Sequence, residues 1–194
     1  MLTEIDEICF GKDYIQATGT STFLLNGEIE QQTAQNVSEW ILSCNCAEDN
    51  EEERRPESLT LFINSGGGDL HAAWQIIAML QGSHIPVRTV AVGLLASASL
   101  LIFLAGHKKM RFMTENVTVM SHQYSWSAEG KHHELMAQVK EYDLTHKRLI
   151  AYYKKAANTT EKKVLKYFMP PQDMYYSSNE AVELGLGDAI ISLS

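Results

Sequence analysis

The sequence predicts an α/β fold in which helices pack against a parallel sheet. Short apolar stretches alternate along the chain with longer segments whose apolar residues recur at helical spacing. The glycine turn Gly66–Gly68 follows one such apolar stretch and precedes a helical pattern, which is the order of a βα unit. With 194 residues, the chain is long enough to bury a substantial core as one domain.

Residue spacing places most elements in the first half of the chain. Residues 1–20 lack clear periodicity and are expected to form an N-terminal arm, so that a single domain spans residues 21–194. Strands are expected at Ser21–Asn26, Leu59–Ile63 and Val87–Val92, and helices at Glu30–Ser43 and Leu70–Gln81. A further helix should follow the serine-containing turn after the third strand and end near residue 106.

The second half of the chain adds short strands and one long helix. Strands are expected at Met110–Phe112, Val117–Met120, Tyr175–Tyr176 and Asp188–Leu193, and helices at Glu129–Lys155, Thr160–Phe168 and Ser178–Gly185. The apolar residues of segment 129–155 stand among many charges. A helix with such polar faces usually projects from a domain or packs on a partner subunit.

Composition and charge exclude several classes of function. The formal net charge of -8 argues against a nucleic-acid partner, which would select a basic surface. The acidic start of the chain has no signal-peptide core, and the apolar run Val90–Gly106 is shorter than the roughly 20 residues of a membrane-spanning helix. The three cysteines suggest no disulfide framework, and Cys44 and Cys46 lack a second ligand pair for a metal. A cytoplasmic chain with reduced thiols and no membrane contact is therefore expected.

Two serines and one histidine stand out as groups that could perform acyl transfer. Ser97 and Ser99 stand in a turn between an apolar strand and an apolar helix, where a fold can expose a nucleophilic hydroxyl. Of the seven histidines, His122 is the best candidate base because it directly follows a buried strand. The glycine turn Gly66–Gly68 either binds an anion through backbone N–H groups or is a plain tight turn. It is not a phosphate-binding P-loop, because no Lys-Ser or Lys-Thr follows it.

Four short motifs occur in order along the chain: LTLFINSGGG, TVAVGLLASAS, VMSHQ and, near the end, EAVELGLGD. Together they resemble ClpP, the family of proteolytic subunits of the ATP-dependent Clp protease, over about residues 21–194. The resemblance implies a fold of repeated ββα units, shared with crotonases, whose protruding handle spans about residues 123–155. It also implies a homo-oligomer of two stacked heptameric rings, which encloses a chamber for unfolded proteins and peptides. A Clp-family ATP-driven unfoldase would feed the chamber, so ATP belongs to that partner and this chain would need no cofactor or metal.

Residue roles follow from the same resemblance, position by position. Ser97, four residues after Gly93, matches the nucleophile, while Ser99 falls where the family has a small packing residue. His122 matches the base that takes the proton of the nucleophile. The remaining expected roles are an oxyanion hole from the N–H groups of Gly68 and Ala98, substrate binding by Gln123, Tyr124 and Ser125, and Asp173 as the third triad member.

One departure from the family pattern leaves three functions open. The family has an Asp eleven residues before the Glu of its last motif, and Met169 stands at that place here. Asp173 is the nearest acid, and about two extra residues around Pro170–Pro171 allow the alignment to shift. The chain is therefore expected to be a serine endopeptidase, with a catalytically impaired structural ring subunit or a crotonase-like acyl-CoA enzyme as alternatives. In the last case, the N–H groups of Gly68 and Ala98 would polarise a thioester.

Overall fold

The computed structural model describes residues 20–47 and 56–193, and a seven-stranded sheet forms its centre. The strands are β1 (Thr20–Asn26), β2 (Ser58–Ser65), β3 (Val87–Ala96), β4 (Arg111–Thr114), β5 (Thr118–Ser121), β6 (Met174–Ser177) and β7 (Ala189–Ile191). The helices are α1 (Gln31–Cys46), α2 (Leu70–Gly82), α3 (Ala98–Leu104), α4 (His132–Ala156), α5 (Glu161–Lys163), the π-helical turn η1 (Val164–Phe168) and α6 (Ser178–Glu183). The expected N-terminal arm lies outside the described residues, apart from Thr20 at the start of β1.

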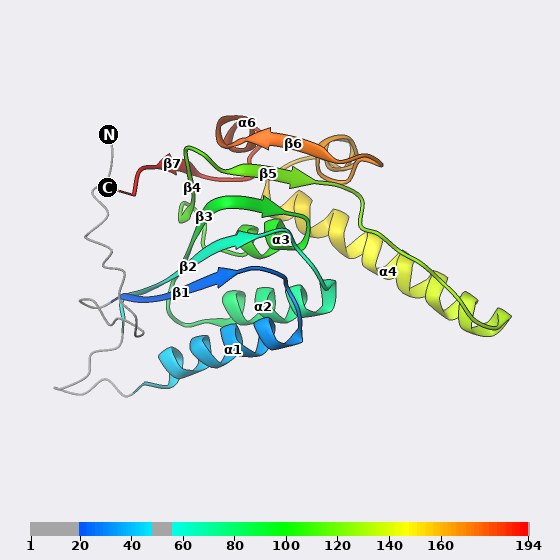
Figure 1. The fold of residues 1–194 in the computed structure, drawn as a ribbon, viewed down its shortest axis with the longest axis horizontal. Helices are drawn as coiled ribbons and strands as arrows, with labels where there is room; N and C mark the ends of the chain where they lie inside the picture. The colour runs from blue at the N-terminus through cyan, green and yellow to red at the C-terminus, as the bar shows by residue number, and fades with distance from the viewer. Residues whose placement is uncertain (1–19, 48–55, 194) are drawn as a thin grey trace.

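Most strands of this sheet run parallel. Their order is β1-β2-β3-β4-β7, and β5 pairs in parallel with the last part of β3. β6 runs antiparallel to β5. Figure 1 shows α1 and α2 side by side beneath the strands, and the two helices contact one another. The predicted α/β fold with a mostly parallel sheet is thereby confirmed.

Apolar strands and helix faces meet in one main core. Residues Leu59–Ile63 of β2 are all buried, as their unbroken apolar composition predicts. The inner faces of α1 and α2 contribute buried residues at helical spacing, including Val37, Ile41, Ile76 and Leu80. Helix α3 is buried along its whole length. Because α3 begins where β3 ends, this core fixes the turn between them.

The long helix α4 leaves the body of the molecule. It has 25 residues and begins three residues later than expected, at His132. Its buried residues, Thr145, Leu149 and Tyr153, all lie in its second half. Figure 1 shows the first half projecting away from the sheet, with the segment that follows β5 running alongside it. The long charged pattern therefore forms the protruding helix that the sequence predicts.

The apolar run Val90–Gly106 does not form a single helix. It is divided between β3 and the seven-residue helix α3, with Ser97 at the junction. Within the described part of the chain, no helix is both long and apolar enough to span a bilayer.

The helix expected at Thr160–Phe168 is also divided. One turn of α5, capped by the hydroxyl of Thr160, continues into η1. There the N–H of Met169 donates to the carbonyl of Val164, five residues earlier, at 2.8 Å. This wider π-type turn changes the path of the chain just before Pro170.

Candidate active site

Ser97 stands at a sharp turn between β3 and α3. Its φ of 53° and ψ of -122° lie outside the conformations that side-chain-bearing residues usually adopt, so neighbouring bonds must hold it there. Its N–H donates to the carbonyl of Met120 in β5 at 3.0 Å. The fully buried Ser99 accepts a bond from the N–H of Ala96 at 2.8 Å, and its Oγ lies 2.9 Å from the carbonyl of Ser65. Ser99 therefore fixes the turn, and Ser97 is the serine that the turn presents.

A bulge in β3 sets the direction in which the strand reaches this turn. Ile63 of β2 pairs with Ala91, but Ser65 pairs with Leu95, so β3 holds two more residues than β2 over this stretch. Gly93 lies in the bulge with a φ of +73°, and a Cβ there would approach the side-chain oxygen of Asn64 to 2.8 Å. β3 consequently continues to residue 96, four residues beyond the end that its apolar pattern predicts.

His122 directly follows β5, and its Nε2 lies 2.9 Å from the Oγ of Ser97. β5 pairs with the last three residues of β3, so the two strands bring the histidine and the serine to the same end of the sheet. The side chain of His122 is 23% exposed. This is the hydrogen-bonded arrangement of a nucleophilic serine and its general base.

Strand register brings Asp173 to the other side of the imidazole. β6 runs antiparallel to β5 with Ser121 opposite Met174, so the adjoining residues His122 and Asp173 face one another. Asp173 Oδ1 lies 3.3 Å from His122 Nδ1. A carboxylate at this place favours the tautomer with its proton on Nδ1, which leaves Nε2 free to accept the proton of Ser97.

Met169 stands where counting along the sequence puts the acid, but its side chain packs into the main core and is only 4% exposed. The π-type turn and the following prolines separate it from β6, so counting back from Glu180 arrives at a residue that is not the one facing the His122 imidazole. The carbonyl of Pro170 accepts a bond from the N–H of Gln123 at 2.8 Å, which ties this loop to the segment after His122. The acid beside the histidine is therefore Asp173.

The glycine turn packs directly against the serine turn. A Cβ on Gly67 would lie 2.8 Å from the Cβ of Ser97, and the φ of Gly67 is +98°, so any other residue would strain the turn or displace the serine. In the described part of the chain, the N–H groups of Gly68 and Ala98 have no hydrogen-bond partner. Ala98 is the first residue of α3, where backbone N–H groups are unpaired. Both groups can therefore donate to an oxyanion formed at Ser97.

A pocket with a volume of about 340 Å³ opens beside Ser97 and His122. Tyr124 and Ser125, two of the three expected substrate-binding residues, line it. Helices α2 and α4 supply lining residues that the sequence did not assign to a site: Leu70, His71, Trp74, Glu141 and Thr145. Helical spacing can identify the faces of these helices, but it carries no signal that the two faces meet at a serine.

The third expected substrate residue, Gln123, contacts α4 instead of lining the pocket. Its Nε2 donates to the hydroxyl of Tyr142 at 2.9 Å. The hydroxyl of Tyr124 donates to the carbonyl of Tyr142 at 3.2 Å, and their rings stack with centroids 5.3 Å apart. Burial, followed by the nearby Tyr142, Glu141 and Asp143, raises the pKa of Tyr124 to about 12. Tyr124 therefore stays a neutral hydrogen-bond donor in the physiological range.

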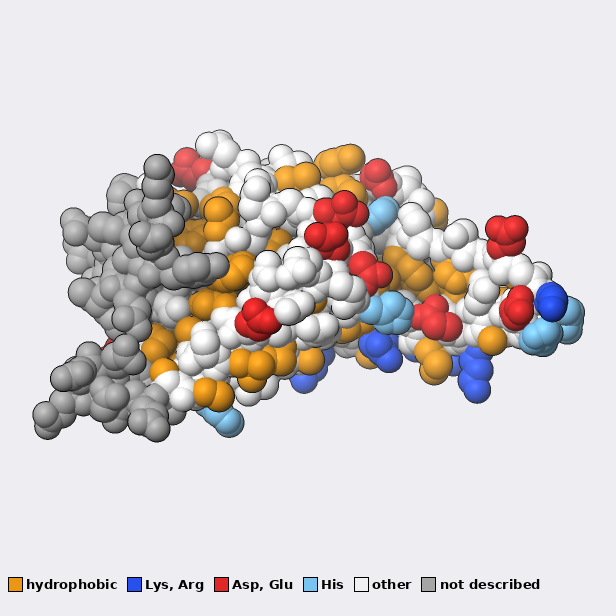
Figure 2. All heavy atoms as spheres, turned by 60° about the horizontal axis from the view of Figure 1, so that its bottom comes forward, with side chains coloured by type: hydrophobic (Ala, Val, Ile, Leu, Met, Phe, Trp, Pro, Cys, Tyr) orange, Lys and Arg blue, Asp and Glu red, His pale blue; other side chains and the backbone are white. Residues whose placement is uncertain are grey.

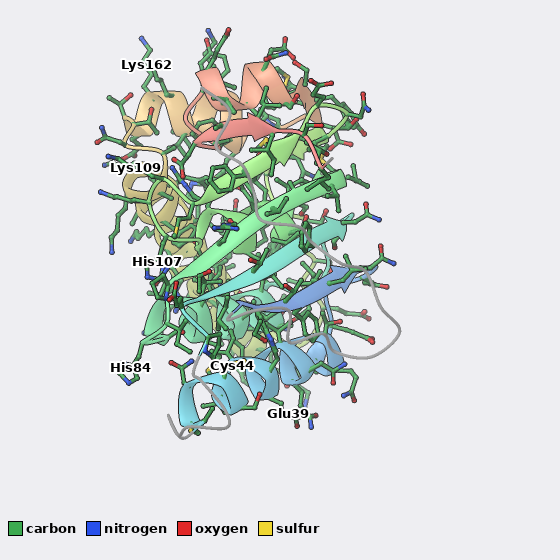
Figure 3. The ribbon with its side chains drawn as sticks, turned by 90° about the vertical axis from the view of Figure 1, so that its left-hand side faces the viewer. Glu39, Cys44, His84, His107, Lys109 and Lys162 are labelled. Atoms are coloured by element: carbon green, nitrogen blue, oxygen red, sulfur yellow. The ribbon has the colours of Figure 1, made fainter. Side chains whose placement is uncertain are left out.

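The other histidines are poorer candidates for the base. The Nδ1 of His107 accepts a bond from the N–H of Val87 at 3.0 Å. Figure 3 shows His84 and His107 at the end of the molecule where β3 begins, whereas Ser97 follows the end of that strand. His71 shares the pocket with His122, but it is the imidazole of His122 that bonds to Ser97. Across residues 20–47 and 56–193, no three His, Cys, Asp or Glu residues group as a metal site.

Comparisons of the sequence and of the structure with known proteins point to the same family. The sequence profile of the Clp protease family matches residues 10–194. The chain is 29% identical over 167 residues to the ATP-dependent Clp protease proteolytic subunit 2 of Treponema denticola, covering 86% of this chain and 80% of that protein. It is 34% identical over 135 residues to the chloroplastic proteolytic subunit 4 of Arabidopsis thaliana, covering 70% of this chain but 46% of that protein. The solved structure of a ClpP1 point mutant from Listeria monocytogenes superposes with a TM-score of 0.76 at 29% identity, covering 88% of this chain and 91% of that one.

Proposed function

We propose, on the premise that this chain belongs to the Clp protease family, that it is a serine-type endopeptidase subunit acting through Ser97. The observation that carries the proposal is the 2.9 Å contact between Ser97 Oγ and His122 Nε2, beside the N–H groups of Gly68 and Ala98, which have no partner among the described residues. A strained serine bonded to an imidazole beside free donors is the arrangement that acyl transfer requires.

The reaction follows from the positions of these groups. His122 Nε2 takes the proton of Ser97 as Oγ attacks the carbonyl carbon of a peptide bond, and the Gly68 and Ala98 N–H groups stabilise the oxyanion. His122 then gives the proton to the leaving amine, which separates and leaves an acyl ester on Ser97. Water, deprotonated by the same imidazole, hydrolyses that ester. Asp173 stabilises the imidazolium in both steps.

The segment after His122 is suited to bind an extended substrate. Tyr124 and Ser125 line the pocket, and Gln123 and Tyr124 are bonded to Tyr142 of α4. A segment held in this way can pair its backbone with a substrate strand, while the pocket accepts a side chain. The bulky Tyr124 and Trp126 would narrow the choice of side chains.

Assembly and partners extend the proposal beyond the single chain. We expect rings of this subunit to stack, with the projecting α4 in contact between them, and an ATP-driven unfoldase to supply unfolded protein. A cytoplasmic location stays a prediction. The impaired-subunit alternative rested on a missing acid, and the 3.3 Å separation between Asp173 Oδ1 and His122 Nδ1 speaks against that alternative. The acyl-CoA alternative stays a prediction.

The test is hydrolysis by purified wild-type protein, Ser97→Ala and His122→Ala, each first checked for the same assembly size. We expect the wild type to cleave fluorogenic peptides and an unfolded protein such as casein, and both variants to lose this activity. Equal cleavage by the wild type and by Ser97→Ala would show that another protein or another residue is responsible.

A further inference from the structure

The pocket beside Ser97 has an apolar part and a charged wall. Leu70 and Trp74 of α2 contribute partly buried apolar surface. Glu141 of α4 lines the same pocket and is exposed, so a ligand can reach it. With a volume of about 340 Å³, the pocket lies near the lower end of the about 300–1,000 Å³ of small-molecule sites. It can therefore hold one long side chain rather than a bulky ligand.

The carboxylate of Glu141 is held in place at this wall. Its Oε1 accepts a bond from the hydroxyl of Thr145 at 2.7 Å, one turn later in α4, and Thr145 is itself only 7% exposed. No ion pair is found for Glu141 within the described residues. The second carboxylate oxygen is thus left for a ligand. Placing a fixed acceptor before the ligand arrives reduces the ordering that binding requires.

The fixed charges in the described lining of the pocket are all negative. Besides Glu141, its titratable lining groups are Asp69, His71, His122 and the neutral Tyr124, and no Lys or Arg lines it in the described part of the chain. Arg148 lies near but is stacked on the ring of Trp74, 5.5 Å from the ring centroid. On the face seen in Figure 2, acidic side chains and histidines gather where the projecting helix leaves the body, and basic side chains lie below them along that helix. A cation entering the pocket would therefore meet negative charge without a competing fixed cation in the lining.

We propose that this pocket binds the substrate side chain on the acyl side of the cleaved bond, and that Glu141 makes it prefer lysine or arginine there. The alkyl stem would lie on Leu70 and Trp74 while the charged head reaches the carboxylate. The inference rests on the proposed peptidase function, and it names Glu141 as the residue that determines specificity.

The experiment compares fluorogenic peptides that differ only in the residue before the cleaved bond: lysine, Nε-acetyl-lysine, which has the same stem without the charge, and leucine. For the wild type we expect kcat/KM to be about tenfold higher for lysine than for acetyl-lysine, the size of a charge-assisted hydrogen bond that solvent partly screens. Glu141→Gln keeps the shape of the side chain and should bring the ratio of kcat/KM for lysine to kcat/KM for acetyl-lysine down to about one. Asp143→Asn is the matched control, because it removes the same charge from α4 outside the pocket lining.

The possible outcomes separate the specificity assigned to Glu141 from the proposed peptidase function. A lysine preference lost in Glu141→Gln and kept in Asp143→Asn supports the assignment. Cleavage after leucine, with cleavage after lysine no faster than after acetyl-lysine, overturns the specificity inference and leaves the peptidase function intact. Loss of the preference in both variants shows a diffuse field rather than a contact at Glu141, and it also overturns the inference. If no peptide is cleaved and Ser97 does not react with a serine-directed probe, the proposed function fails, and this inference fails with it.

Discussion

Replacing Asp173 by Asn tests how much the acid contributes to activity. In the serine-triad template the same change lowers turnover by about 10⁴. Here the carboxylate stands 3.3 Å from His122 Nδ1, and its side chain is 52% exposed. At that separation, the attraction to an imidazolium is about 1.3 kcal/mol in water and about 5 kcal/mol at an effective dielectric constant of about 20. A half-exposed pair should lie between these limits, so we expect kcat/KM to fall by about 100-fold, which is about 2.7 kcal/mol.

The assay is steady-state hydrolysis of a leucine peptide by wild type, Asp173→Asn and Glu183→Gln. Glu183 is an exposed acid on α6 outside the pocket lining, so its replacement controls for the loss of one negative charge. Two results would refute the reasoning: unchanged activity in Asp173→Asn, or a loss as complete as that of Ser97→Ala. The first would mean that the carboxylate does not orient the imidazole. The second would mean that it acts as a buried acid would, despite its exposure.

Three further predictions concern the support of the site. Gly67→Ala should destabilise the protein by about 1–3 kcal/mol and lower kcat by about 100-fold, because the added Cβ would press on Ser97. Denaturant unfolding measures the first effect and steady-state kinetics the second. A variant that is both active and stable would contradict the packing argument. Tyr142→Phe should raise KM about fivefold through loss of the 2.9 Å hydrogen bond from Gln123, and Tyr142→Ala should raise KM further. In both variants Ser97 should still react with a serine-directed probe. An unchanged KM in both would show that the segment after His122 does not need its contacts with Tyr142. Burial alone would raise the pKa of Asp188, but hydrogen bonds and the charge of Arg111, with the backbone N–H groups of Arg111 and Lys109, lower it overall. The stability that this carboxylate provides is therefore present above its ordinary pKa and lost as pH falls through the lowered folded-state pKa. Water partly screens the ion pair of Asp188 with Arg111, so Asp188→Asn should lower the free energy of unfolding by about 2 kcal/mol at neutral pH, less than the loss of a fully buried pair. The variant should also flatten the acid side of the plot of Tm against pH. An unchanged slope there would contradict the pH dependence assigned to Asp188.

The sequence reveals those parts of the site that depend on local order along the chain. Ser97 and His122 each follow an apolar strand directly, and neighbouring parallel strands end at the same edge of a sheet. Their proximity was therefore predictable from strand order and from the resemblance. The end of β3 was not, because Gly93 breaks the apolar pattern and the strand continues only through the bulge held by Asn64.

The acid and the pocket depend on packing that spacing does not record. Asp173 reaches His122 through the antiparallel register of β5 and β6, whereas counting back from Glu180 arrives at Met169. That count assumes a regular path, and the π-type turn before Pro170 changes the path. Glu141 is one charge among many on a helix. Only the rotation of α4 about its own axis, set by the burial of Thr145 and Leu149, points it to the pocket.

The most direct test of the central claim is the reaction of Ser97 with a fluorophosphonate, followed by intact mass and by mapping of the modified peptide. We predict one adduct on each wild-type chain, located on Ser97, and none on Ser97→Ala. Labelling of His122→Ala should be much slower, because the serine then lacks its base. No adduct on a folded wild-type protein, or an adduct that persists in Ser97→Ala, would contradict the claim that Ser97 is an activated nucleophile.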